Sequence, residues 1–420
     1  MALRGAKGVQ ARFARYIESL VSVIGHADRA GPLRDYCTGL IVSEARKSVE
    51  PMAAITAPDR TGAQHQSLLH FVGQGPWSDE AVLGKVREMV LPQIERHGPI
   101  TAWIIDDTGI PKKGQHSVGV AHQYCGQLGK QANCQVAVSL SIANHAASLP
   151  VAYRLYLTKD CEARRLKAKV PEQICFKTKQ EIALEHIHWA CEIGLPGDMV
   201  LLDAGYGHDS KLRAGITALG KTYAAGIQPQ TLVWVPGKQP GRAPKKGRRD
   251  APNTISVKEL ALGLRAKAWH RIEWREGTNE RLCSRFARVR VHVASSHEQA
   301  EKPAKEWLLV EWPEGEDAPT KYWLSTLPKS IPFRDLVDAA KLRWRVERDY
   351  QELKQEVGLN HFEGRGWPGF HHHATLCIAT YGFLISERET IPPSGLRRAR
   401  LFPEIAVSDG YQPRGASIAA

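Results

Sequence analysis

The chain has 420 residues and is 43% hydrophobic, with 57 Lys and Arg against 44 Asp and Glu and a net charge of +13. This length indicates two or three domains, and the apolar content excludes wholesale disorder. The excess of positive charge favours a polyanionic partner, and nucleic acid is the first candidate.

Membrane and secreted classes are not expected. The longest apolar stretch near a terminus, around 375–385, is about half of the ~20 residues that a membrane span needs. The basic start lacks the apolar region of a secretory signal. Eight cysteines are scattered without a CxxC pair or a zinc-module spacing, which is typical of reduced thiols. We therefore expect a cytoplasmic protein.

The first part of the chain has a helical pattern. Phe13, Tyr16, Ile17, Leu20 and Ile24 recur at steps of three and four residues, as on one face of a helix. The pattern resumes after a turn and continues to about residue 95. A small helical N-terminal domain is the prediction.

The pattern changes at Ile100 to short apolar runs rich in β-branched residues. The first run ends in Asp106-Asp107-Thr108-Gly109, and the last ends in Asp203. Strands followed by a helix and another strand predict an α/β sheet. The expected strands are 101–105, 134–144, 151–157 and 199–202, and the expected helix is 178–193.

Residues 224–330 have a different composition. Pro, Gly, Lys and Arg crowd into 236–249, and alternating segments surround this loop, so we expect an inserted, mostly β subdomain. Helices are expected at 332–357 and 374–387, followed by an extended tail. The predicted division is 1–95, 96–223, 224–330, 331–390 and 391–420.

Three acids stand out by context. Asp106 and Asp203 each follow an apolar strand, and Glu347 lies in a helix. Functional groups of α/β sheets gather at the carboxyl ends of strands, although such Asp residues often only cap the next turn. Together the three offer oxygen ligands for Mg²⁺, with Mn²⁺ as a substitute. Two such ions can drive phosphodiester cleavage.

Helix geometry adds two cations to Glu347. At ~100° per residue, Arg343 and Lys354 lie within about 40° of Glu347 on one side of the helix. A carboxylate flanked by two cations suits a metal-bound phosphate. The alternative is an ordinary salt-bridged helix surface.

The stretch from Arg343 to Glu347, with Lys354, resembles the Y-(2)-R-(3)-E-(6)-K signature of bacterial insertion-sequence transposases with a DDE active site. The Tyr position is Ala340, so only the Arg-Glu-Lys part is intact. The runs DDTGIPKKGQHSVGVAHQYCGQLGKQANCQ and GRGWPGFHHH look like the DDE superfamily endonuclease branch of that group. The resemblance covers roughly 64–387.

The resemblance implies an RNase H-like core interrupted by a β-rich insertion, a helical DNA-binding N-terminal domain and a carboxylate triad. Glu347 matches the third acid and Asp203 the second. The first acid is Asp106 by the family's D-x-T pattern, with Asp107 as the alternative. Adjacent strand residues point to opposite faces, so only one of these two can meet Asp203 directly.

Further positions are candidates for DNA contact. Lys112 and Lys113 could touch phosphate or form a solvated turn. Tyr322 and Trp323 lie where related hairpin-forming transposases keep a base-stacking Trp, with Tyr322 the better match, or are buried β-subdomain aromatics. The histidines 371–373 form either an exposed loop or a helix start near DNA. Contacts with the phosphate backbone of DNA are expected from Arg242, Lys245, Lys246, Arg248 and Arg249.

The expected function is therefore a metal-dependent, nucleoid-associated transposase. It would bind the terminal inverted repeats of its element as a homodimer on double-stranded DNA, nick by water attack, and join the freed 3′-hydroxyl to target DNA. The alternatives are a domesticated or inactive DNA-binding regulator, which the missing Tyr at Ala340 favours mildly, and an RNase H-like nuclease without strand transfer.

Overall fold

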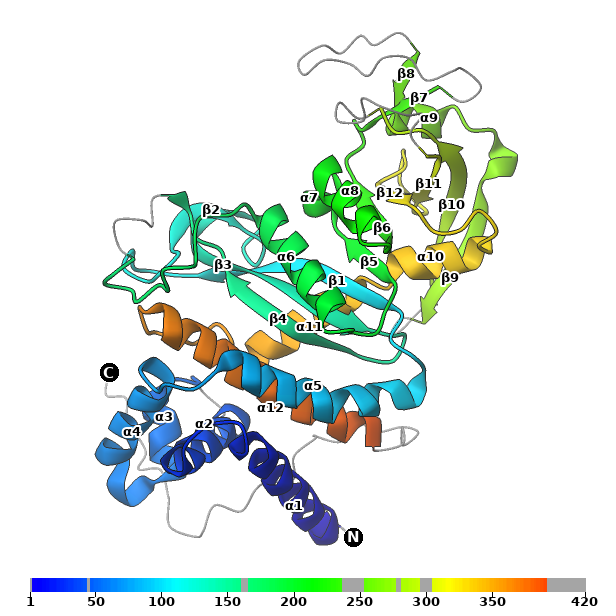
Figure 1. The fold of residues 1–420 in the computed structure, drawn as a ribbon. Helices are drawn as coiled ribbons and strands as arrows, with labels where there is room; N and C mark the ends of the chain where they lie inside the picture. The colour runs from blue at the N-terminus through cyan, green and yellow to red at the C-terminus, as the bar shows by residue number, and fades with distance from the viewer. Residues whose placement is uncertain are drawn as a thin grey trace, which may run out of the picture.

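The computed structural model describes residues 2–43, 46–159, 165–235, 253–276, 281–294 and 304–390. It is a mixed α/β structure built on one ten-stranded sheet with helices packed against it (Figure 1). The basic residues Arg242, Lys245, Lys246, Arg248 and Arg249 and the tail 391–420 lie outside the described residues. Within the described residues, no helix is long and apolar enough to cross a membrane.

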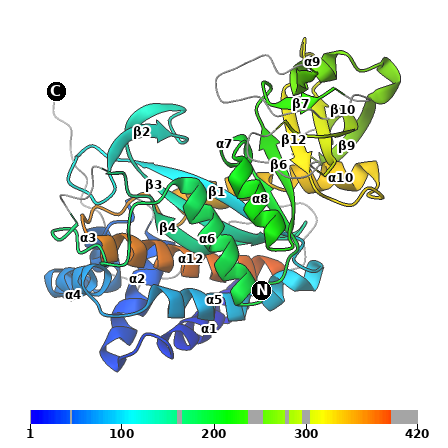
Figure 2. The same ribbon diagram turned by 45° about the horizontal axis from the view of Figure 1, so that its top comes forward.

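The N-terminal helices gather around the last helix, α12 (Trp367–Thr390). Nearly every residue of α12 from Phe370 to Ile385 is buried, as expected of a helix that is apolar all round. Figure 2 shows α12 lying between the N-terminal helices and the sheet. One buried cluster extends from Tyr16 through the sheet to α12. The surrounding helices are α1 (Ala2–Val21), α2 (Ala30–Val42), α3 (Val49–Thr56), α4 (Thr61–Gly73) and α5 (Asp79–Ile94).

The core strands have the order β4-β3-β1-β5-β6. β2 pairs with the first residues of β3, on the same edge where β4 pairs with the later ones. β3 is antiparallel to β1 and β4, whereas β5 is parallel to β1 and β6. This is the expected RNase H-like arrangement. The strands are β1 (Ala102–Pro111), β2 (Ala121–Cys125), β3 (Lys130–Ala143), β4 (Ser148–Leu155), β5 (Met199–Leu202) and β6 (Thr222–Ile227).

The strands after β6 continue the core sheet. β12 (Lys321–Ser325) pairs antiparallel with β6, and β11, β10 and β9 follow toward the far edge. The expected insertion is therefore rich in β-strands and joined edge to edge to the core, while the five-part division remains a prediction. Its other elements are β7 (Leu232–Trp234), β8 (Thr254–Ser256), α9 (Val257–Leu262), β9 (His270–Glu276), β10 (Arg281–Val291) and β11 (Glu306–Trp312).

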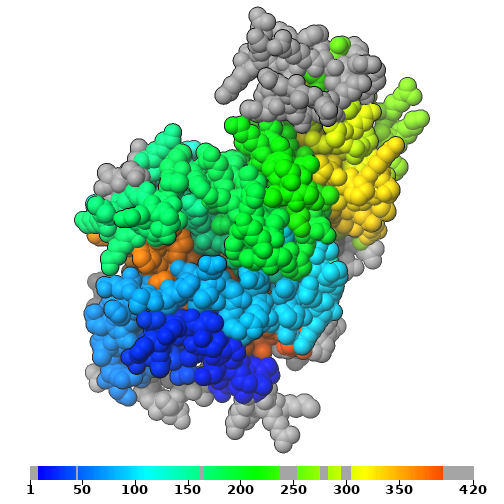
Figure 3. All heavy atoms as spheres, in the orientation of Figure 1, coloured from blue at the N-terminus to red at the C-terminus, as the bar shows by residue number. Residues whose placement is uncertain are grey.

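The remaining helices cover the sheet. α6 (Lys179–Glu192) and α8 (Ser210–Ala218) pack against β3 and β6 respectively, and the short α7 (Ala204–Gly207) follows β5. α10 (Phe333–Lys341) contacts β9 and β6, and α11 (Trp344–Gln355) contacts β1, β4 and α12. In Figure 3 the insertion forms the end of the molecule opposite the N-terminal helices.

Several expected boundaries were wrong. The helix expected over 332–357 is divided into α10 and α11. β1 does not end before the acids but continues through Asp106 and Asp107 to Pro111, because β3 pairs with it along its whole length. The last helix begins at Trp367, so it contains the three histidines instead of following them. His372 and His373 are buried, so the histidines form neither an exposed loop nor a DNA-facing helix start.

Candidate active site

Strand register brings the first two acids level. The parallel pairing of β1 with β5 ends at Ile104 and Leu201, and Asp106 and Asp203 each lie two residues further. Neighbouring strands are ~4.8 Å apart, and both side chains point the same way as those of the last pair. The structure therefore places Asp106 and Asp203 side by side where β5 ends.

The turn after Asp203 is packed tightly against β6. Asp203 caps α7, its Oδ1 accepting a hydrogen bond from the Tyr206 N–H at 2.9 Å. A Cβ on Gly207 would lie 2.1 Å from the carbonyl oxygen of Gly226, and one on Gly226 would lie 2.8 Å from the Ala204 nitrogen. The two glycines thus allow the close approach that holds Asp203 at this edge of the sheet.

Asp107 has different partners from Asp106. Its Oδ2 pairs with Lys179 Nζ at 2.9 Å and accepts a hydrogen bond from Tyr206 Oη at 3.3 Å. It therefore connects β1 to α6 and α7. Lys179 was missed in the sequence, because a lysine at a helix start has no local signal that pairs it with a strand 72 residues away.

Asp106 is connected to Glu347 through one guanidinium. Arg343 Nη1 lies 3.0 Å from Asp106 Oδ2, and Arg343 Nη2 pairs with Glu347 Oε1. The Arg343–Glu347 pair is the i,i+4 salt bridge expected if this face of the helix were an ordinary surface. Arg343 also pairs with Asp106 of β1, however, which an ordinary helix surface would not do. The geometry thus connects Asp106 to Glu347 through Arg343, with Asp203 level with Asp106 and in the same cavity wall as Arg343 and Glu347, and Asp106 as the first acid stays a prediction.

Burial and charge perturb this group. The pKa of Asp106 is raised to about 7, chiefly by burial; Arg343 opposes this rise, and the charges of Asp203 and Asp107 add to it. Burial lowers the pKa of Arg343, but Asp106, Glu347 and Asp203 outweigh it, so that the pKa is raised overall. A carboxyl that titrates near neutrality is typical of a functional site.

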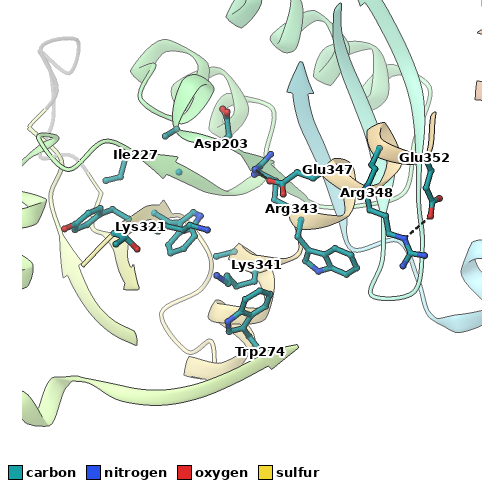
Figure 4. Close-up of a pocket in the computed structure, with 17 residues that line it drawn as sticks. Asp203, Ile227, Trp274, Lys321, Lys341, Arg343, Glu347, Arg348 and Glu352 are labelled. Atoms are coloured by element: carbon teal, nitrogen blue, oxygen red, sulfur yellow. Dashed lines mark hydrogen bonds and ion pairs between the residues drawn. The ribbon is translucent and has the colours of Figure 1, made fainter. Parts of the chain in front are cut away.

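Glu347 lies between two cavities. The larger has a volume of about 1160 Å³ and is lined by Asp203, Arg343 and Glu347, with Trp274 and Lys341 among the residues of its other walls. Figure 4 shows Arg343 and Glu347 between Asp203 on one side and Trp274 and Lys341 on the other. The smaller, about 500 Å³, is lined by both Asp106 and Asp107, by Glu347 and by Lys354.

The carboxylates fit a divalent ion by donor type. Among the described residues, however, no three His, Cys, Asp or Glu side chains are grouped closely enough to hold a metal ion. Asp106 and Glu347 instead share Arg343. A metal held by both acids would require Arg343 to release at least one of them.

Of the lysines predicted to touch phosphate, two donate hydrogen bonds to backbone carbonyl oxygens and one is exposed. Lys354 Nζ donates to the carbonyl oxygen of Gly109 at 2.9 Å, which ties the end of α11 to β1. Lys112 Nζ donates to the carbonyl oxygen of Phe362 at 2.6 Å, and burial lowers its pKa to about 8. Lys113 is exposed, so it is the freer of the two neighbouring lysines for an external phosphate.

The aromatics of the insertion line the larger cavity. Tyr322 and Trp323 are both buried in β12, and Tyr322 Oη donates to the carbonyl oxygen of Pro319 at 2.9 Å. Their burial agrees with the alternative of core aromatics. Trp274 was missed in the sequence, because its alternating segment had no feature that distinguished it from the other alternating segments of the insertion. The centroid of its ring lies 3.9 Å from Lys341 Nζ, and this ammonium group pairs with Glu311 at 2.7 Å.

Comparison with known proteins places these features in a family. The model of the DDE superfamily endonucleases matches residues 19–281, more than half of the chain, and this chain belongs to that family. Members generally use divalent metal ions. The matched range includes Asp106 and Asp203 and ends before Glu347.

A more specific likeness is to a curated insertion-sequence protein. The chain is 32% identical over 173 residues to the "Probable transposase for insertion sequence element IS701" of Microchaete diplosiphon. The match covers 41% of this chain and 42% of that relative, so the chain matches less than half of the relative's length.

Proposed function

We propose that this chain is a DNA transposase that cleaves element ends and transfers the freed strand into target DNA. The observation that carries the proposal is the grouping of Asp106, Asp203 and Glu347 around Arg343, at the edge where β5 ends. The family membership supports endonuclease chemistry, and the relative's name supports transposition. The net charge of +13 suits a polyanionic substrate.

Asp106, Asp203 and Glu347 would hold divalent metal, Mg²⁺ or Mn²⁺. When bound, two such ions activate the attacking water or 3′-hydroxyl and stabilise the leaving oxygen. Arg343, once released from a carboxylate, presents its guanidinium to a phosphate in the larger cavity. Lys354 holds α11 on β1, and Asp107 holds Lys179 and Tyr206 beside the acids.

The substrate would be double-stranded DNA, first the terminal inverted repeats and then the target. Two chains would act together on paired ends, as a homodimer on DNA, and the protein would associate with the nucleoid. The larger cavity, about 1160 Å³ and lined by Trp274 and Trp344 among others, has room and ring faces for an unpaired nucleotide.

The test is strand transfer with Mg²⁺ on DNA that carries the element's ends, comparing the chain with Asp203→Ala and Glu347→Ala. Both variants should bind DNA and lose joining. Undiminished joining by either would overturn the proposal. Cleavage without joined products would identify an RNase H-like nuclease, and DNA binding without cleavage a regulator.

A further inference from the structure

The helix that carries Glu347 has a second carboxylate on its opposite side. Asp349 follows Glu347 by two residues, so at ~100° per residue the two side chains point in nearly opposite directions. Glu347 is 62% exposed, whereas Asp349 is 3% exposed. Asp349 therefore contacts the protein interior and is not among the groups that meet a substrate.

Two hydroxyl groups from other elements hold Asp349. Ser148 Oγ, at the start of β4, donates to Asp349 Oδ2 at 2.6 Å, and Tyr381 Oη, within α12, donates to Oδ1 at 2.9 Å. A buried carboxylate is costly without such partners. These contacts fix one point of α11 against both β4 and α12.

A second contact lies one turn further along the same face. Glu352 Oε2 is 2.9 Å from Tyr381 Oη and 2.6 Å from Arg388 Nη1, another residue of α12. Arg348 also pairs with Glu352, within α11. Tyr381 and Arg388 therefore connect α12 to two successive positions of α11.

These contacts restrict the rotation of α11. Apolar packing alone tolerates small rotations, whereas buried directional hydrogen bonds favour one arrangement. Side chains extend ~5–6 Å from a helix axis, so a rotation of ~20° would displace the Glu347 carboxylate by ~2 Å. A misplacement of ~1 Å can cost about 10²-fold in rate.

We propose that Asp349, Ser148 and Tyr381 form a positioning cluster that sets the rotation of α11 and thereby holds Glu347 opposite Asp106 and Asp203. The cluster touches no substrate and acts through Glu347. The inference rests on the proposed function, in which Glu347 is the third acid of the site.

The test compares Tyr381→Phe with Tyr16→Phe. Tyr16 is also buried and its hydroxyl donates to α12, at the carbonyl oxygen of Ala379 at 2.8 Å, but it has no contact with α11 among its hydrogen bonds. Tyr381→Phe loses the hydroxyl contacts with Asp349 and Glu352, and Tyr16→Phe loses the one with Ala379, while both variants keep their rings. Mn²⁺ affinity is measured by electron paramagnetic resonance titration, and kcat and KM by DNA cleavage.

We expect Tyr381→Phe to lower kcat and Mn²⁺ affinity by ~10-fold or more, because a small misplacement of Glu347 is costly, while KM for DNA stays within about twofold. Tyr16→Phe should leave all three unchanged. Asp349→Asn, which keeps an oxygen acceptor, should retain more activity than Asp349→Leu, of similar size.

Equal effects of Tyr381→Phe and Tyr16→Phe at similar thermal midpoints would overturn the inference alone, provided that the unaltered chain cleaves DNA. An unaltered chain that neither binds Mn²⁺ nor cleaves DNA would overturn the proposed function, and this inference with it.

Discussion

At the scale of single residues, two adjacent aspartates have different partners. Asp106 pairs with Arg343 and lies level with Asp203, while Asp107 pairs with Lys179. The sequence pattern favoured Asp106, and strand alternation required that only one of the two meet Asp203. The Lys179 partner could not be predicted, since it comes from a distant helix brought in by tertiary packing.

Substitution should separate the two aspartates. Asp106→Asn removes a proposed metal ligand and should abolish cleavage, whereas Asp107→Asn alters an outer contact and should cost ~10–100-fold. Cleavage rates in Mg²⁺ and Mn²⁺ measure both. If Asp107→Asn were the inactive variant and Asp106→Asn the mildly impaired one, Asp107 would be the first acid.

Asp106 should also make stability depend on pH when metal is chelated. Burial raises its folded-state pKa from 3.8 to about 7. Between these values the folded chain keeps a proton that the unfolded chain has released. The stability that this proton contributes is therefore full below the unfolded pKa and is lost as pH rises through about 7.

Asp106→Asn should consequently unfold at higher urea than the unaltered chain at pH 8, and the gain should shrink toward pH 5. Between pH 5 and the folded-state pKa of about 7 the difference grows by about 1.4 kcal/mol per pH unit, so the gain at pH 8 should exceed the gain at pH 5 by on the order of 3 kcal/mol. Urea titrations in EDTA at both pH values measure it. Parallel pH profiles for the two proteins would contradict the assigned pKa.

At the scale of elements, the turn from β5 into α7 is the feature that places Asp203. A short apolar run predicted β5 and the Asp that follows it. The contact of Gly207 with Gly226 was not predictable, because it depends on how closely α7 approaches the neighbouring strand. β1 was predicted too short for a related reason: its polar half is held by pairing with β3, which a local pattern does not show.

Gly207→Ala should destabilise the chain by ~1–3 kcal/mol, because its Cβ would overlap the Gly226 carbonyl oxygen and force the turn away from β6. Gly84→Ala is the matched control: it lies inside α5 with nothing within 4 Å of the added Cβ and should stabilise by ~1 kcal/mol. Chemical denaturation measures both. A neutral Gly207→Ala would show that the turn is not constrained in this way.

At the scale of the whole molecule, the N-terminal helices and the strands of the insertion share a core and a sheet with the rest of the chain, which the sequence did not indicate. Apolar periodicity predicted helices in the first part of the chain, and short apolar or alternating runs predicted strands in the core and within 224–330. These patterns could not show that α12, at the other end of the described chain, lies between the N-terminal helices and the sheet, nor that β12 extends the core sheet through β6. Both depend on long-range packing.

The N-terminal helices and the core should therefore unfold together. Hydrogen exchange measured by mass spectrometry should give α2, α5, α12 and β3 similar opening free energies, because one buried cluster runs through all four. Removal of residues 1–75 would expose α12 and should leave an aggregating chain. Independent exchange of α2 and α5 from β3 would indicate a separate N-terminal domain.

The central claim is that Asp106, Asp203 and Glu347 form one metal-dependent site. Its most direct test is cleavage of end-bearing DNA by the unaltered chain, Asp203→Asn and Glu347→Gln, with thermal midpoints measured alongside. The account predicts cleavage in Mg²⁺, none in EDTA, and at least ~1000-fold loss in both folded variants, a size typical of residues that act as a unit. Cleavage that persists in EDTA, or in either variant, would contradict it.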